Sequence, residues 1–118
     1  MKAQKEQHNW KALVDLFSTR NQGRPTRLGV LSNPPDAMED YWLEDGLPLA
    51  GVDVDTHADG TPSIEIMLGD ERHAESRRLT HVVTNARSLK FVVTALGDAD
   101  GLEVEGEDGK TTVLRFES

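Results

Sequence analysis

The residues best placed to do chemistry lie in the segment VDVDTHADGTPSIEI, residues 52–66. Asp53, Asp55 and His57 are spaced two residues apart, so in an extended strand their side chains project from one face. Carboxylate oxygens and an imidazole nitrogen are ligand types that divalent metal ions take in proteins. These three residues are therefore the candidate metal ligands of the sequence.

Two observations favour a hairpin over a metal site in this segment. An EF-hand loop that began at Asp55 would need an oxygen donor at its third position and a glutamate at its twelfth, where this chain has His57 and Ile66. Apolar residues at the even positions 52, 54, 64 and 66 alternate with the polar ones, which is typical of two half-buried strands. We predict no metal and no cofactor. Whether the polar face meets water, a cation or another subunit's arginines stays open.

Among the four histidines, His81 alternates with apolar residues, which points it toward the core or the rim of a sheet. A histidine in such a place either has a structural hydrogen-bond partner or acts as a ligand or general base. Ser76 and Ser88 lie near histidines in the sequence, but no strand–turn–helix nucleophile elbow surrounds them. We favour a structural His81 and retain it as a candidate binding residue.

Two further groups are candidates for binding a protein. Tyr41 and Trp42 lie beside acidic residues, and aromatic anchors ringed by charge are typical of interfaces. Arg72, Arg77 and Arg78 form a basic segment that could accept the acidic surface of another subunit. Burial under the helix would explain the aromatic pair equally well.

The charge layout excludes some classes of partner. The net charge is −8, and residues 30–71 contain eleven acids and no Lys or Arg. Nucleic-acid binding depends on Lys and Arg that displace counterions, so we expect no nucleic-acid partner. No apolar run has the length of a signal peptide or a membrane span, and we expect a cytoplasmic protein without a membrane partner. The alternating basic and acidic blocks either face each other, within the fold or between subunits, or are solvated separately.

The first expected element is an amphipathic helix over residues about 9–20. Its apolar stripe consists of Trp10, Leu13, Val14 and Phe17. Asn9 is suited to cap its start, whereas Asn21 and Gly23 are suited to a left-handed C-cap before Pro25. We expect the stripe to cover the core of a sheet.

Beyond Pro25 the apolar period changes to two, which predicts strands from about 26 to 117 with an acidic loop over about 32–46. The apolar positions 47 and 49 are odd while 52 and 54 are even, so we expect a bulge at Ala50–Gly51. Residues opposite each other in an antiparallel pair share a face, which favours pairs such as Val54 with Ile64 and Val104 with Leu114. This parity predicts an odd-numbered final hairpin loop with Gly109 left-handed.

The segments LPLAGVDVD, IEIMLGD, LTHVVTNARSLKFV and LEVEGEDGKTTVLRF follow a tryptophan-bearing helix. Together they resemble a family of small bacterial and archaeal proteins catalogued only as a domain of unknown function. The resemblance covers most of the chain and implies a fold, but it transfers no catalytic residues. The chain departs from the family pattern in the acidic segment NPPDAMEDYWLEDG and in TNARS, where a proline is more usual.

These observations predict a single α+β domain over residues 1–118, with one N-terminal helix packed on a curved, mainly antiparallel sheet of five to seven strands. Closure of the sheet into a small β-barrel is an alternative. The expected function is that of a small acidic, non-catalytic module that binds a protein partner or forms a homo-oligomer. The alternative is a small enzyme or metal-dependent ligand binder centred on His81 with Asp53, Asp55 or His57.

Overall fold

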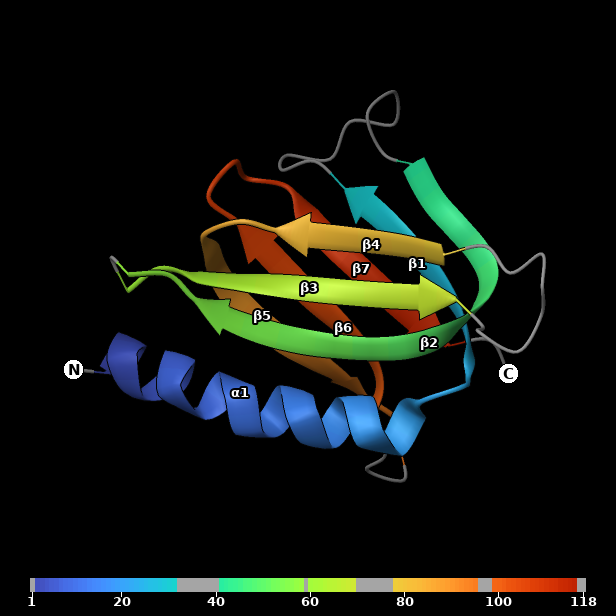
Figure 1. The fold of residues 1–118 in the computed structure, drawn as a ribbon, viewed down its shortest axis with the longest axis horizontal. Coiled ribbons are helices and arrows are strands. Elements are labelled where there is room, and N and C mark those ends of the chain that lie inside the picture. Colours follow the sequence, from blue (N-terminus) through green and yellow to red (C-terminus); the bar gives the residue numbers. More distant parts are fainter. Residues whose placement is uncertain (1, 32–40, 59, 70–77, 96–98, 117–118) are drawn as a thin grey trace.

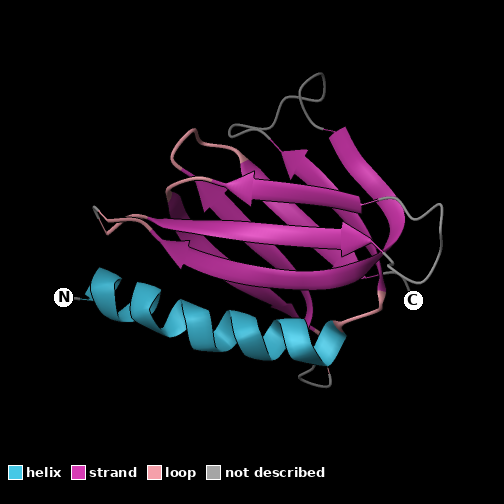
Figure 2. Ribbon diagram, in the orientation of Figure 1, coloured by secondary structure: helices cyan, strands magenta, loops and turns pink. Residues whose placement is uncertain are grey.

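The structure is a computed structural model that describes residues 2–31, 41–58, 60–69, 78–95 and 99–116, of which 2–8, 41–45 and 99 are described by their backbone alone. Within these residues one helix precedes seven strands, whose arrangement is drawn in Figures 1 and 2. The elements are α1 (Lys2–Asn21), β1 (Pro25–Leu31), β2 (Tyr41–Thr56), β3 (Pro62–Gly69), β4 (Arg78–Val83), β5 (Ala86–Val93), β6 (Ala99–Gly106) and β7 (Thr111–Phe116).

The strands form one antiparallel sheet in the order β4-β3-β2-β1-β7-β6-β5. The predicted fold class, a helix on a curved antiparallel sheet, is therefore confirmed. The barrel alternative is not realised, because β4 and β5 end the sheet and do not pair with each other. Figure 1 shows β2, β3 and β4 in front of β1, β7, β6 and β5, whose strands run across them.

The long strand β2 changes its pairing partner along its length. Its first part pairs with β1, and its second part, from Leu49 onward, pairs with β3. The register shifts between Leu49 and Gly51, where the bulge was predicted. Leu49 and Val52 are consequently both buried although their positions differ in parity. The predicted acidic loop over 32–46 is wrong at its end, because residues 41–46 already belong to β2 and residues 32–40 lie outside the described chain.

Two hairpins have the same three-residue loop. In the β2–β3 hairpin the His57 N–H donates to Thr61 O, and in the β6–β7 hairpin the Gly106 N–H donates to Lys110 O. Gly60 and Gly109 have φ values of 89° and 82°, so both loops place glycine in the left-handed region. The odd loop and the left-handed Gly109 are therefore confirmed.

The predicted register is right in one of these hairpins and wrong in the other. Val54 pairs with Ile64 as expected. Leu114, however, pairs with Leu102 instead of Val104. Both registers keep the same faces inward, so the apolar pattern alone could not separate them.

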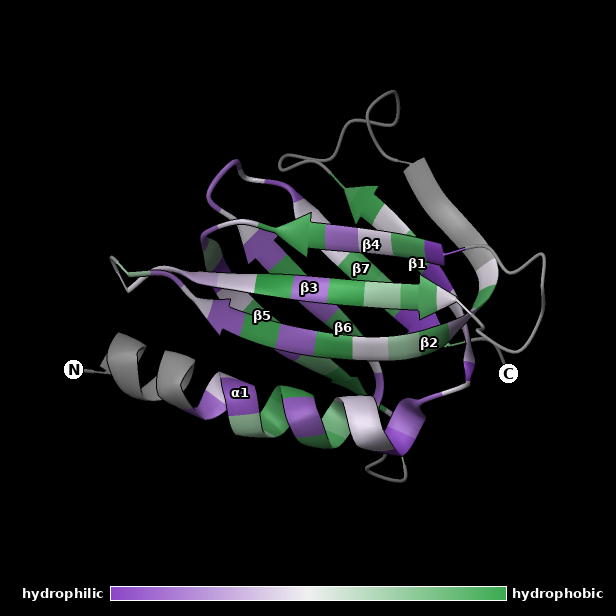
Figure 3. Cartoon of the chain, in the orientation of Figure 1, coloured by the Kyte–Doolittle hydropathy of each residue, from purple (hydrophilic) through white to green (hydrophobic). Residues whose placement is uncertain are grey.

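The core lies between the two parts of the sheet and is closed on one side by α1. Its largest fully buried side chains come from β1, β2, β3, β6, β7 and α1: Leu28, Leu49, Ile64, Ile66, Leu68, Leu102, Leu114 and Val14. Figure 3 shows the alternation of hydrophobic and hydrophilic residues along β2 and β3. Burial of each such side chain contributes roughly 1.5–3 kcal/mol.

Helix α1 differs from its prediction at its start and on one face. It begins at Lys2, so Asn9 lies within it and does not cap it, because the preceding Lys, Ala, Gln and Glu residues are good helix formers. It ends at Asn21, and Gly23 has a φ of 90°, as the C-cap prediction required. Trp10, Val14 and Phe17 are buried, but Leu13 is 47% exposed and was wrongly assigned to the core. In the described part of the chain, no helix has the length and apolar character needed to cross a membrane.

Candidate functional site

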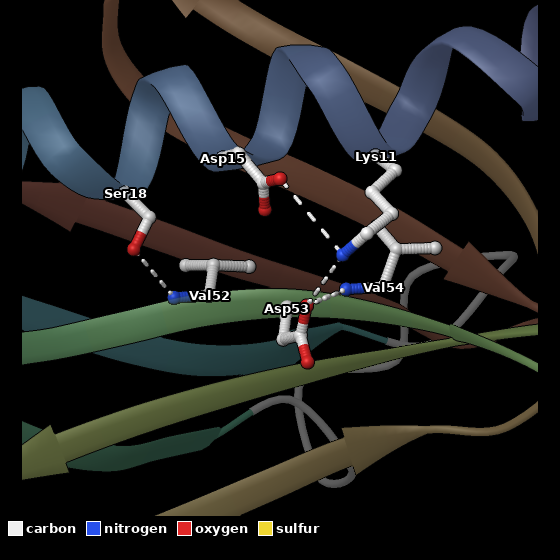
Figure 4. Close-up of polar contacts among 6 residues, drawn as sticks. All are labelled: Lys11, Asp15, Ser18, Val52, Asp53 and Val54. Atoms are coloured by element: carbon white, nitrogen blue, oxygen red, sulfur yellow. Dashed lines mark hydrogen bonds and ion pairs between the residues drawn. The ribbon is translucent and has the colours of Figure 1, made fainter.

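Asp53 lies at the junction between α1 and the edge of β2. Beyond the bulge, one edge of β2 pairs with β3 and the other faces α1 (Figure 4). The Val52 N–H donates to Ser18 Oγ at 3.0 Å, and the Val54 N–H donates to Asp53 Oδ1 at 3.0 Å. Lys11 Nζ lies 3.5 Å from the same Asp53 oxygen. The helix and the Asp53 carboxylate thus satisfy backbone groups that a neighbouring strand would otherwise satisfy.

The other two candidate metal ligands do not join Asp53 in a site. His57 Nε2 lies 2.6 Å from Ser63 Oγ, and Asp55 is exposed on β2. Within the described residues, no three His, Asp or Glu side chains are placed to hold a metal ion. Asp53 is thus paired with Lys11, while His57 has a different partner.

His81 lies on the opposite face of the sheet from Asp53. Across β2, β3 and β4, His81 is in register with Ile66 and Val52, both of which are buried. Asp53 is in register with Glu65, on the outer face. The alternative constellation of His81 with Asp53 is therefore not assembled in this fold.

His81 connects two strands that are not neighbours in the sheet. Its Nε2 lies 3.0 Å from Oγ1 of Thr112, so the pair links β4 to β7 across the core. Burial lowers the pKa of His81, because the charged imidazolium is poorly solvated there. The adjoining cavity of about 250 Å³ is also lined by Thr84, Asp108 and Lys110. His81 therefore connects the layer that contains β4 to the layer that contains β7.

The remaining predicted binding residues are only partly described. Arg78 is exposed at the start of β4. Arg72 and Arg77 lie outside the described residues. The backbone of Tyr41 and Trp42 pairs with β1, and their side chains lie outside the described part.

A groove that the sequence reasoning missed runs between α1 and β5. A cavity of about 470 Å³ is lined by Leu13 and Leu16 of the helix and by Phe91 of β5. Leu13 and Leu16 are 47% and 50% exposed. A second cavity of about 390 Å³ also contains Leu13 and Phe91 and continues to Ser88 and Leu89. The two cavities together are called the α1–β5 groove below.

Two arginines at different ends of this groove have no ion-pair partner among the described residues. Arg20 lines the first cavity and Arg87 the second, and both are exposed. Arg24 differs, because its guanidinium lies 3.3 Å from Asp100 and 4.2 Å from the centre of the Phe116 ring. The groove is therefore apolar in its middle and basic at its ends.

The helical wall of the groove corresponds to a second stripe of residues that can be read from the sequence. Residues 13, 16 and 20 repeat at i, i+3 and i+7, beside the buried stripe of residues 10, 14 and 17. Because Leu13 fits either stripe, the sequence suggests one broad apolar face. The position of β5, which leaves this second stripe uncovered, is not encoded in the helix itself.

Comparison of the chain with protein-family models, with curated proteins and with solved structures finds no match in any of the three. The resemblance to a family of unknown function thus stays a prediction, and the site rests on the geometry described above.

Proposed function

We propose that the protein is a non-catalytic interaction module that binds another protein chain through the α1–β5 groove. The observation that carries this proposal is the half-exposure of Leu13 and Leu16 in a groove of about 470 Å³. Exposed apolar side chains that gather in one concave place are typical of interaction sites.

The polar residues with catalytic potential support the non-catalytic part of this proposal. Asp53, His57 and His81 each bond to a structural partner: the β2 backbone and Lys11, Ser63, and Thr112, respectively. Two of these contacts pair an imidazole with a hydroxyl, as a catalytic base and its nucleophile are paired. Both hydroxyls, however, belong to buried residues, Ser63 and Thr112, which limits the access of a substrate. The α1–β5 groove is lined by Phe91 and by arginines at its ends, and aromatic residues and arginine are enriched in protein interfaces.

The test is capture from a lysate at two salt concentrations, together with sedimentation of the purified protein. The test variant is Leu13→Glu/Leu16→Glu, which places charge in the groove. The matched control is Leu31→Glu, because Leu31 is also exposed but lies on β1 and does not line the groove. We expect the wild type and the control to retain the same partner, and the groove variant to lose it.

Two outcomes would contradict the proposal. One is a protein that stays monomeric at high concentration and low salt and captures no partner. The other is a partner that both variants capture equally, because such binding would not use the groove.

A further inference from the structure

One edge of β5 borders the α1–β5 groove and is open. β5 is the last strand of the sheet, and its only strand neighbour among the described residues is β6. Ser88 and Leu89 both line the groove, although consecutive side chains of a strand lie on opposite faces. A groove that reaches both faces of β5 runs along its edge. Unpaired backbone groups at such an edge can pair with an added strand.

The dimensions of the groove suit a short extended segment. Its helical wall runs from Asn9 to Asn21, which is about 18 Å at the rise of an α-helix. An extended chain covers that length with about five or six residues. Apolar side chains at alternate positions of such a segment would meet Leu13, Leu16 and Phe91.

The charges at the groove select the chemistry of that segment. Arg20 and Arg87 lie at its ends, while the nearby Arg24 is already paired with Asp100. Among the described residues that line the groove, the unpaired charge is therefore positive, although the chain as a whole carries −8. An acidic segment would gain from both arginines.

The same charges disfavour a second copy of this chain as the occupant. β5 has the sequence ARSLKFVV, with Arg87 and Lys90 and no acid. Antiparallel pairing of two β5 edges would bring these basic strands together, and like charges across a strand pair are destabilising.

The geometry points to an extended acidic–apolar segment of a partner protein, which adds to the free edge of β5 as a further strand with its acidic ends at Arg20 and Arg87. This inference rests on the proposed function and specifies its ligand and binding mode. It does not require Tyr41, Trp42 or the arginines of residues 72–78.

The probe is a fluorescein-labelled peptide, Glu-Glu-Leu-Thr-Leu-Glu-Glu, titrated with the full chain and followed by fluorescence anisotropy. We expect Arg20→Glu and Arg87→Glu each to weaken binding by about fivefold. Lys110→Glu is the matched control, because it makes the same charge change on the exposed β6–β7 hairpin and should leave the affinity unchanged. A peptide with lysine in place of each glutamate should not bind.

Backbone pairing is tested with two further peptides, N-methylated at the odd or at the even positions. A strand added to an edge uses alternate amides, so one of these peptides should lose binding and the other should retain it. Hydrogen exchange should then show protection of alternate β5 amides in the complex and no change in β4.

Four results would overturn the inference. With the first two peptides, these are equal binding of the acidic and the basic peptide, or no binding of either. The third is equal binding of both N-methylated peptides, and the last is protection of β5 that grows with protein concentration in the absence of peptide. The last result would assign the edge to a second copy. If Leu13→Glu/Leu16→Glu still abolishes capture of a partner while the acidic peptide fails to bind, the proposed function stands and this inference alone fails.

Discussion

At the scale of single residues, several polar side chains connect separate parts of the fold. Ser18 and Asp53 cover backbone groups along the edge of β2, and His81 joins β4 to Thr112 of β7. Thr112 is buried at a position where alternation favours an apolar residue. It is tolerated there because the imidazole of His81 satisfies its hydroxyl.

The first prediction concerns the pH dependence that His81 gives to stability. Burial lowers its pKa below the ordinary value of 6.5, so the unfolded chain binds the proton more readily than the folded one. Its contribution is fully present above pH 6.5 and declines as the pH falls toward the folded pKa. We expect urea unfolding to show that His81→Gln, which cannot titrate, loses less stability than the wild type between pH 7.5 and 5.5.

Asp108 and Lys110 line the same cavity as His81, and both variants retain them. Comparing the unfolding free energies of the two proteins at each pH therefore isolates the effect of the His81 imidazole on stability. A difference in unfolding free energy that does not change with pH would contradict the role assigned to burial.

The second prediction concerns the bond between α1 and the edge of β2. Ser18→Ala leaves the N–H of the buried Val52 without its partner, at a cost of about 1–3 kcal/mol. Thr19→Ala is the control, because Thr19 is the next residue of the helix and is exposed. Urea unfolding of the two variants measures the difference. Equal losses of unfolding free energy in the two variants would mean that water replaces the Ser18 hydroxyl as the acceptor for the Val52 N–H.

At the scale of elements, the alternation of apolar residues predicted the hairpins and the buried face of each strand. It did not predict features that depend on how segments far apart in the chain pack together. The bulge beside Gly51 and the Val54–Ile64 pair followed from parity alone. The Leu102–Leu114 pair did not, since a shift of two residues preserves both faces. The α1–β5 groove could not be predicted, because it depends on how far β5 lies from a helix more than 60 residues earlier in the chain.

The third prediction concerns the loop between β2 and β3. Gly60 has a φ of 89°, and a Cβ built there meets no atom within 4 Å, so only backbone strain opposes a side chain. Gly60→Ala should cost about 1–2 kcal/mol of unfolding free energy. Gly60→Asn should cost less, because Asn adopts left-handed conformations more readily. Equal costs in urea unfolding would show that the loop relaxes into another turn.

At the scale of the whole molecule, α1 closes the side of the core that the sheet leaves open. Charge blocks along the chain meet within the fold, because Lys11 of the basic N-terminal part lies beside Asp53, and Arg24 lies beside Asp100. Phe17 connects the helix to two strands of the layer that contains β5 and β7, since its ring centroid lies 5.4 Å from that of Phe91 and 5.6 Å from that of Phe116. The groove exists because the neighbouring residue, Leu16, is left outside this contact.

The last prediction tests this division of the helix into a buried and an open stripe. Phe17 is 3% exposed, and Phe17→Ala should cost about 3–5 kcal/mol, a large part of the total stability of a typical domain. Phe17→Leu keeps most of the volume and should cost less, which preserves a measurable unfolding transition. Leu16→Ala should cost under about 1 kcal/mol, because Leu16 is 50% exposed. If urea unfolding shows that Leu16→Ala costs as much as Phe17→Ala, Leu16 is buried in solution, the groove is closed there, and both binding proposals lose their foundation.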